Sequence, residues 1–156
     1  MIESPQRVLI TGAAGFIGSH LTDRLLERGL EVIGIDDLSS GSRANLASAL
    51  RKPRFRFVEG DLLDPGAIRQ VLGKCASVFH LAADPEVRVG VENPDSHYRQ
   101  NLQATYNLLE AIRKRNTPTR LVFTSTCPCN SLQVHQSMEP AHSVTKTYTG
   151  AFSGNS

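Results

Sequence analysis

The stretch Arg7–Asp37, RVLITGAAGFIGSHLTDRLLERGLEVIGIDD, decides the fold of this chain. A short apolar run leads into a turn that contains Gly12, Gly15 and Gly18, and an amphipathic segment and a second apolar run follow. Glycines lack a Cβ and let the backbone approach a pyrophosphate closely, and the positive end of the next helix faces the phosphates. The pattern therefore predicts a strand, a turn, a helix and a strand that together bind a dinucleotide.

The carboxylate at the end of the second predicted strand indicates the kind of dinucleotide. Asp36 lies about 20 residues after the glycine turn, the separation that dinucleotide-binding folds use. A carboxylate there accepts hydrogen bonds from the adenosine ribose and repels a 2′-phosphate. We therefore predict that the cofactor is NAD rather than NADP. The alternative interpretation is a solvated acidic turn.

Strand and helix patterns continue to alternate along the chain. Short apolar runs predict strands at 7–11, 31–35, 55–59, 77–81 and 120–124. Helical spacing predicts helices at 16–28, 43–50, 65–74 and 94–115. Such alternation gives a parallel sheet with right-handed crossovers. We predict an α/β fold, a Rossmann-like doubly wound parallel sheet with strand order 3-2-1-4-5.

Composition excludes several classes of function. The chain has 156 residues, a formal net charge of +2 and 40% hydrophobic residues, which fits one globular domain. Basic residues are too few and too scattered for a nucleic-acid partner, and no apolar run reaches membrane-spanning length. The N-terminus lacks signal-peptide features, and three cysteines do not suggest a disulfide framework. We expect a cytoplasmic protein with neither nucleic acid nor membrane as a partner.

The character of the sequence changes after about Thr126. The last 30 residues carry only Glu139 and Lys146 as charged residues and show no sustained period. We therefore predict two parts, an NAD-binding domain over 1–126 and an atypical, largely irregular tail over 127–156. No metal is expected in the tail, because its cysteines and histidines match no zinc-site spacing. These residues are Cys127, Cys129, His135 and His142.

An ordered series of motifs resembles a known family from about Arg7 to Thr126. The motifs are TGAAGFIGSHL at 11–21, IDDLSSG at 35–41, EGDLLD at 59–64, HLAA at 80–83, HYRQNLQATYNLLEAIR at 97–113 and RLVFTST at 120–126. The chain resembles the extended short-chain dehydrogenases/reductases, in the branch of NAD-dependent nucleotide-sugar epimerases and dehydratases. The resemblance implies a chain that stops before the last strands and before the domain that binds a UDP-sugar.

The resemblance also implies which residues contact NAD. The first helix would present backbone N–H groups to the pyrophosphate, and later segments would line the adenosine and the nicotinamide ribose. The implied residues are Gly12, Gly15, Phe16, Ile17, Gly18, Asp36, Asp37, Ser40, Gly41, Asp61, Leu62, Leu81, Ala82, Ala83, Asn101 and Thr124. Two alternatives remain open, namely a turn role for Asp61 and a helix-surface role for Asn101.

The catalytic residues of the family are matched only in part. The family uses a hydroxyl residue after the fifth strand and a Tyr-x-x-x-Lys pair, in which the tyrosine exchanges a proton with the sugar hydroxyl. Thr126 matches the hydroxyl position and Lys146 the lysine position, but His142 stands where the tyrosine belongs. A histidine can transfer protons near neutral pH, so His142 is a candidate base. The alternative is that His142 is an incidental residue of the tail without a catalytic role.

Three hypotheses about function follow. The chain is an epimerase that needs a further segment, an NAD-binding module without chemistry, or an inactive truncated product. Family members dimerise through the long helix around 98–112 and through the tyrosine-bearing helix. Only the first of these is recognisable in the sequence, and it is the basis for expecting a homodimer.

Overall fold

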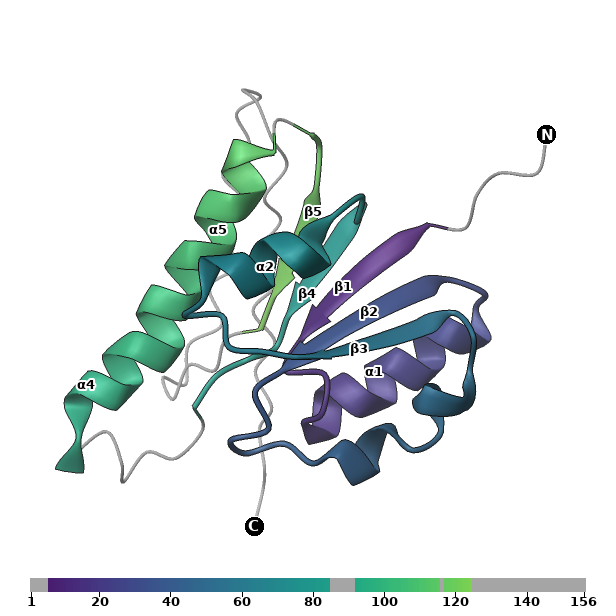
Figure 1. The fold of residues 1–156 in the computed structure, drawn as a ribbon, viewed down its shortest axis with the longest axis horizontal. Coiled ribbons are helices and arrows are strands. Elements are labelled where there is room, and N and C mark those ends of the chain that lie inside the picture. Colours follow the sequence, from purple (N-terminus) through teal and green to yellow (C-terminus); the bar gives the residue numbers. More distant parts are fainter. Residues whose placement is uncertain (1–5, 85–91, 116, 125–156) are drawn as a thin grey trace, which may run out of the picture.

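The computed structural model describes residues 6–84, 92–115 and 117–124 and contains a five-stranded parallel sheet (Figure 1). The strand order is β3-β2-β1-β4-β5, so the predicted doubly wound order is confirmed. The strands are β1 (Arg7–Thr11), β2 (Glu31–Asp36), β3 (Phe55–Glu59), β4 (Ser77–His80) and β5 (Arg120–Phe123).

The apolar run of β1 forms the centre of the sheet. Val8 is in register with Val32 of β2 on one side and with Ser77 of β4 on the other. Both faces of β1 are covered, so its side chains are apolar without alternation, as in other buried parallel strands. Leu9 and Ile10 are fully buried on opposite faces, and each contributes about 1.5–3 kcal/mol through burial.

One face of the sheet packs against helix α1 (Phe16–Glu27). Leu25 and Leu26 of this helix form a cluster with Val8, Ile10 and Val32. The helical spacing in the sequence therefore directs its apolar side towards this face. Figure 1 shows α1 beneath β2 and β3, on the opposite side from the other long helices.

The other face is covered by α2 (Pro65–Leu72) and by a long helix. The long helix consists of α4 (Pro94–His97), a π-helical segment η3 (Tyr98–Gln103) and α5 (Ala104–Lys114). Ile68 from α2 and Leu108 from α5 are fully buried there against Leu9, Ile33 and Val78. No helix in the described part of the chain is long and apolar enough to cross a bilayer.

Two predicted helices differ from the structure in their local geometry. The helix predicted over 43–50 is replaced by two short 3₁₀ helices, η1 (Arg43–Leu46) and η2 (Ala49–Arg51). Their buried residues Leu46 and Ala49 are three apart, a spacing that 3₁₀ turns bring onto one side.

The long helix was predicted as one regular α-helix, but its middle is π-helical. The Thr105 hydroxyl donates to the Asn101 carbonyl at 2.6 Å, and a side chain inserted into the backbone ladder is a known cause of such irregularity.

Candidate cofactor-binding site

The predicted site residues of the described chain gather at one edge of the sheet. The strands are parallel, so their carboxyl ends meet at this edge, where ligands of open α/β sheets bind. Each predicted segment begins where a strand ends. The glycine turn follows β1, Asp36 ends β2, Asp61 follows β3, Leu81 follows β4 and Thr124 follows β5.

The turn after β1 brings backbone against backbone. Gly12 has a φ of +69°, and a Cβ at this position would lie 2.7 Å from the Ala82 nitrogen. A Cβ on Gly18 would overlap the Gly12 carbonyl oxygen. The Gly12 amide donates to the Ile35 carbonyl of β2 at 3.0 Å. Glycine at these two positions therefore lets the start of α1 sit directly on the strand ends.

The start of α1 is built to face an anion. Gly15 is the N-cap and has no side chain to cover the first backbone N–H groups. The first turn, from Phe16 to Ser19, has no acidic side chain. Phe16 and Ile17 are 78% and 63% exposed. The N–H groups of this turn, with the positive end of the helix dipole, make the start of α1 electropositive.

Asp36 lies beside this start of α1. It is 8% exposed, one carboxylate oxygen accepts from the Ala14 amide at 2.8 Å, and the other accepts from the Leu38 amide at 2.8 Å. The carboxylate is therefore fixed against the glycine turn. An ionised carboxylate has about four acceptor sites, so two remain after these two bonds.

The loop after β2 closes over the turn. The amide of Ser42 donates to the Ala14 carbonyl at 3.1 Å, and Asn45 donates to the same carbonyl at 2.8 Å. A Cβ on Gly41 would come within 3.0 Å of the Asp36 carboxylate. Sequence reasoning missed Asn45 and Ala14, because Ala14 acts through its backbone and Asn45 is one of several polar loop residues.

The neighbouring loop residues differ in their surroundings. The Asp37 carboxylate accepts from the Ser39 amide at 3.0 Å and from its hydroxyl at 2.7 Å. Asp37 therefore shapes its own turn, while Ser40 is exposed.

The segment after β3 supports the turn interpretation of Asp61. Its carboxylate accepts from the Leu63 amide at 2.8 Å, which forms a local turn. Leu62 is 5% exposed and belongs to the core beneath α5. The Leu62 carbonyl accepts from the Asn107 side chain at 3.1 Å, so the long helix holds this segment.

The chain leaving β4 is also tied to its surroundings. The amides of Leu81 and Ala82 donate to the Thr11 hydroxyl at 3.2 and 3.3 Å, while Ala83 is exposed. Asn101 accepts from the Asp84 amide at 2.7 Å and donates to its carbonyl at 3.4 Å. Asn101 is therefore engaged with the segment after β4, unlike a free helix-surface residue.

The end of β5 contributes one described candidate. The amide and hydroxyl of Thr124 each donate to the His80 carbonyl at 3.4 Å. Thr126, His142 and Lys146 lie outside the described residues. The same holds for the tail residues weighed as metal ligands, Cys127, Cys129 and His135. Among the described residues, no group of three or more His, Cys, Asp or Glu could hold a metal ion.

Sequence reasoning gave no role to His80. It is 1% exposed and lies between the hydroxyls of Thr11 and Thr105, at 2.7 and 2.8 Å. Burial lowers the pKa of His80 from 6.5 to about 4, so the ring is neutral near pH 7. No local pattern could have revealed it, because the contact with Thr11 joins residues 69 apart in sequence.

A hollow of about 320 Å³ lies at the opposite edge of the sheet. Arg7, Glu31 and Arg54 line it, and Arg7 pairs with Glu31 at 2.8 Å. This ion pair joins the amino ends of β1 and β2. The hollow is therefore separate from the strand ends that carry the predicted site.

Known proteins resemble this chain over most of its length. A family model described as the NAD dependent epimerase/dehydratase family matches residues 8–148. The UDP-glucose 4-epimerase of Mycolicibacterium smegmatis is 46% identical over 110 residues, which cover 69% of this chain and 34% of that protein. This chain thus spans about a third of the curated relatives it matches.

Solved structures agree with these sequence matches. The Thermus thermophilus UDP-glucose 4-epimerase in complex with NAD is 41% identical, with a TM-score of 0.67 over 78% of this chain and 38% of that one. The Thermotoga maritima UDP-glucose 4-epimerase with UDP-glucose is 34% identical, with a TM-score of 0.72 over 85% of this chain and 42% of that one. The chain belongs to the NAD dependent epimerase/dehydratase family.

Proposed function

We propose that this chain binds NAD at the carboxyl edge of its sheet. The single observation that carries the proposal is the position of Asp36, whose buried carboxylate is fixed to the Ala14 amide beside the start of α1. A group with a pyrophosphate and an adenosine ribose fits this combination of an electropositive helix start and an adjacent acceptor. The solved relative from Thermus thermophilus, described as an NAD complex, supports the same choice.

Different residues of the chain would bind the pyrophosphate and the ribose of NAD. The N–H groups of Phe16 and Ile17 would receive the pyrophosphate, because their helix positions lack intrahelical acceptors. The two remaining acceptor sites of Asp36 would receive the ribose hydroxyls. Gly41 and Ala82 would contribute surface around the adenosine and the nicotinamide ribose, as the family resemblance implies, and the buried Leu62 would support the adenosine end from the core.

The finer function we propose is the cofactor-binding part of a nucleotide-sugar epimerase, with a UDP-sugar as substrate. Bound NAD supplies a hydride acceptor and donor for the sugar carbon. Thr126 would hydrogen-bond the reacting oxygen, Lys146 would bind the nicotinamide ribose, and His142 is the candidate proton-transfer group. The competing functions are an NAD-binding module without chemistry and an inactive product. Interconversion of UDP-glucose and UDP-galactose at saturating NAD separates the first from the other two.

Calorimetric titration of NAD against Asp36 variants tests the binding proposal. Asp36→Ala removes both ribose acceptors, and we expect its Kd for NAD to rise at least about tenfold, the effect of losing charge-assisted hydrogen bonds. The parent is expected to bind NAD more tightly than NADP, because the carboxylate repels a 2′-phosphate. Asp36→Asn removes the negative charge, so its affinities for NAD and for NADP should differ less than those of the parent.

Glu31→Gln is the matched control for these variants. It removes one negative charge from the same strand at the opposite edge of the sheet, where Glu31 pairs with Arg7. Its NAD affinity should equal that of the parent. Equal NAD binding by the parent and by a folded Asp36→Ala chain would refute the proposal.

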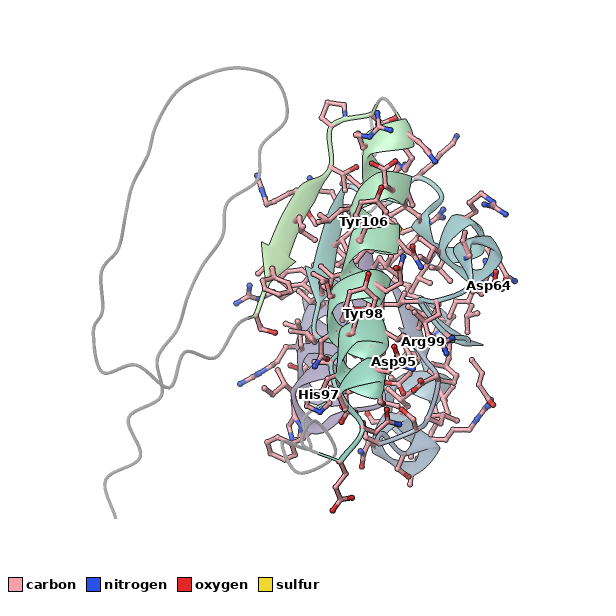
Figure 2. The ribbon with its side chains drawn as sticks, turned by 90° about the vertical axis from the view of Figure 1, so that its left-hand side faces the viewer. Asp64, Asp95, His97, Tyr98, Arg99 and Tyr106 are labelled. Atoms are coloured by element: carbon pink, nitrogen blue, oxygen red, sulfur yellow. The ribbon has the colours of Figure 1, made fainter. Side chains whose placement is uncertain are left out.

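We also propose that two copies of the chain associate through the long helix. Four large apolar side chains follow one another along it and are exposed by 43–60%, namely Tyr98, Leu102, Tyr106 and Leu109. Their spacing of three or four residues puts them on one side of a helix, and Figure 2 shows Tyr98 and Tyr106 on the outer surface of this helix. An apolar stripe of this kind is typical of a helix that packs against a partner.

Sedimentation velocity tests the association. Leu102→Glu introduces a charge into the stripe and should shift the parent from dimer to monomer. Leu50→Glu is the control, because Leu50 is also exposed, by 42%, but lies in η2 away from the stripe. A parent that sediments as a monomer would refute this proposal without touching NAD binding.

A further inference from the structure

The buried ring of His80 connects three elements that meet behind the candidate site. Its Nδ1 is 2.7 Å from the hydroxyl of Thr11 at the end of β1, and its Nε2 is 2.8 Å from the hydroxyl of Thr105 in α5. The third neighbour is the Phe123 ring of β5, with ring centroids 5.5 Å apart. The ring therefore contacts two hydroxyl groups and one aromatic ring, none of them charged.

The Thr11 end of this arrangement has a definite hydrogen-bond direction. The Thr11 hydroxyl oxygen accepts from the Ala82 amide at 3.3 Å and shares the Leu81 amide with the Thr11 carbonyl, each at 3.2 Å. A hydroxyl oxygen has two acceptor sites and one proton to donate. Because both amides point at this oxygen, the Thr11 proton is left for His80, and we assign Nδ1 as the unprotonated nitrogen.

The Thr105 end leads independently to the same assignment. The Thr105 hydroxyl donates its proton to the Asn101 carbonyl at 2.6 Å. It can therefore only accept from His80, so Nε2 must carry the ring proton. Both ends agree on a neutral ring with the proton on Nε2, and the lowered pKa of His80 is in keeping with it.

We propose that His80 is a positioning residue for the cofactor site, held as its Nε2–H tautomer in a directed hydrogen-bond chain from α5 to the strand ends. The chain runs from the amides of Leu81 and Ala82 through Thr11 and His80 to Thr105. The two amides belong to the backbone that lies against Gly12, so the hydrogen-bond chain fixes this backbone beside the glycine turn. The effect of this hydrogen-bond chain on NAD affinity rests on the proposed function. The tautomer of His80 and the position of the two amides do not depend on NAD.

The test uses Thr105, because its hydroxyl contacts the ring of His80 directly and makes no hydrogen bond to Leu81 or Ala82 itself. Thr105→Val keeps the shape of the side chain but removes the acceptor for Nε2–H. Thr105→Ser restores a hydroxyl. Thr119→Val is the matched control, since Thr119 is 9% exposed and its hydroxyl accepts from Arg115 away from the site.

The first readout is a nitrogen–proton correlation spectrum of the histidine rings in the isotope-labelled full chain without NAD, assigned with His80→Gln. We expect the Nε2–H tautomer alone for His80 in the parent and in Thr105→Ser. An Nδ1–H ring, or an average of the two tautomers as in solvent, would overturn the proposal.

The second readout is amide hydrogen exchange. In Thr105→Val the exchange of the Ala82 amide should rise by about tenfold relative to Ile33 of β2, the effect expected when a buried group loses its partner. The Leu81 amide should change less, because it also donates to the Thr11 carbonyl at 3.2 Å. Thr105→Ser and Thr119→Val should leave this ratio unchanged. A uniform rise over all strands would show only lost stability and would overturn the proposal.

The third readout is the affinity for NAD. We expect Thr105→Val to weaken NAD binding by about fivefold to tenfold, the range of a lost buried hydrogen bond, and Thr105→Ser to match the parent. Unchanged NAD affinity in Thr105→Val with altered exchange would overturn the positioning role. A parent that does not bind NAD would refute the proposed function, while the spectrum and the exchange ratio would still decide on the hydrogen-bond chain.

Discussion

At the scale of single residues, Gly12 shows how backbone geometry and close contact combine. Its φ of +69° is unfavourable for other residues, and a Cβ would meet the backbone of Leu81 and Ala82 at 2.7–2.9 Å. We expect Gly12→Ala to lower the free energy of unfolding by at least about 2 kcal/mol, because strain and overlap add. Urea denaturation followed by circular dichroism measures this loss.

Gly73→Ala separates the two contributions. Gly73 also has a positive φ, of +32°, but a Cβ there would meet nothing within 4 Å. The loss should therefore be limited to backbone strain of about 1 kcal/mol. A loss for Gly12→Ala no larger than that for Gly73→Ala would mean that the close approach of Gly12 to the backbone of Leu81 and Ala82 contributes nothing.

His80 makes stability depend on pH. Burial lowers its pKa in the folded chain from 6.5 to about 4, so the unfolded chain binds a proton at a higher pH than the folded chain does. The free energy of unfolding should therefore fall as pH decreases from 6.5 to 4, by about 3 kcal/mol from this group. Urea titrations of the parent and of His80→Gln between pH 4 and 6.5 measure this pH dependence of the free energy of unfolding. The variant should lose this part of the slope, and an unchanged slope would contradict the assignment.

At the scale of elements, the start of α2 depends on one side chain. The Asp64 carboxylate accepts from the amides of Gly66 and Ala67 at 2.7 and 3.3 Å, and Pro65 occupies the first helical position. We expect Asp64→Ala to lower the free energy of unfolding by about 1 kcal/mol, because two helix-end donors lose their acceptor. Asp64→Ser keeps a capping oxygen and should recover most of this loss in the same urea titration.

The long helix shows that a helix can serve the site without entering it. Asn107 holds the segment after β3 through the Leu62 carbonyl, and Asn101 holds the segment after β4 through Asp84. Thr105 lies between them and contacts His80. One helix therefore fixes the exits of β3 and β4, two strands that β2 and β1 separate in the sheet, while Leu108 of the same helix is buried in the core.

At the scale of the whole molecule, the reaction rate of the Cys75 thiol should report on unfolding of the core. The side chain of Cys75 is 1% exposed in the core under α2 and α5, and burial raises the pKa of its thiol to about 11. Thiolate is the reactive form, so we expect Cys75 in the folded chain to react with an aromatic disulfide reagent far more slowly than a free cysteine. The measurement uses Cys127→Ser with Cys129→Ser, so that only Cys75 reacts. Its rate should follow the fraction unfolded in urea, and rapid reaction without urea would contradict a closed core.

Much of the fold followed from local patterns. The apolar runs, the glycine turn and the helical spacing predicted five parallel strands in the observed order, because period and turn sterics are properties of neighbouring residues. The π-helical segment and the two 3₁₀ helices were missed, because the spacing of apolar residues does not distinguish these short helix types from an α-helix.

The sequence by itself determined that a glycine turn, a helix start and Asp36 meet where the strands of a parallel sheet end. Only the tertiary structure decided how each group is used. It fixed the Asp36 carboxylate on the Ala14 amide and enclosed His80 between two hydroxyls. The physical reason is that hydrogen-bond direction and burial depend on groups brought together by packing, and these groups lie far apart along the chain.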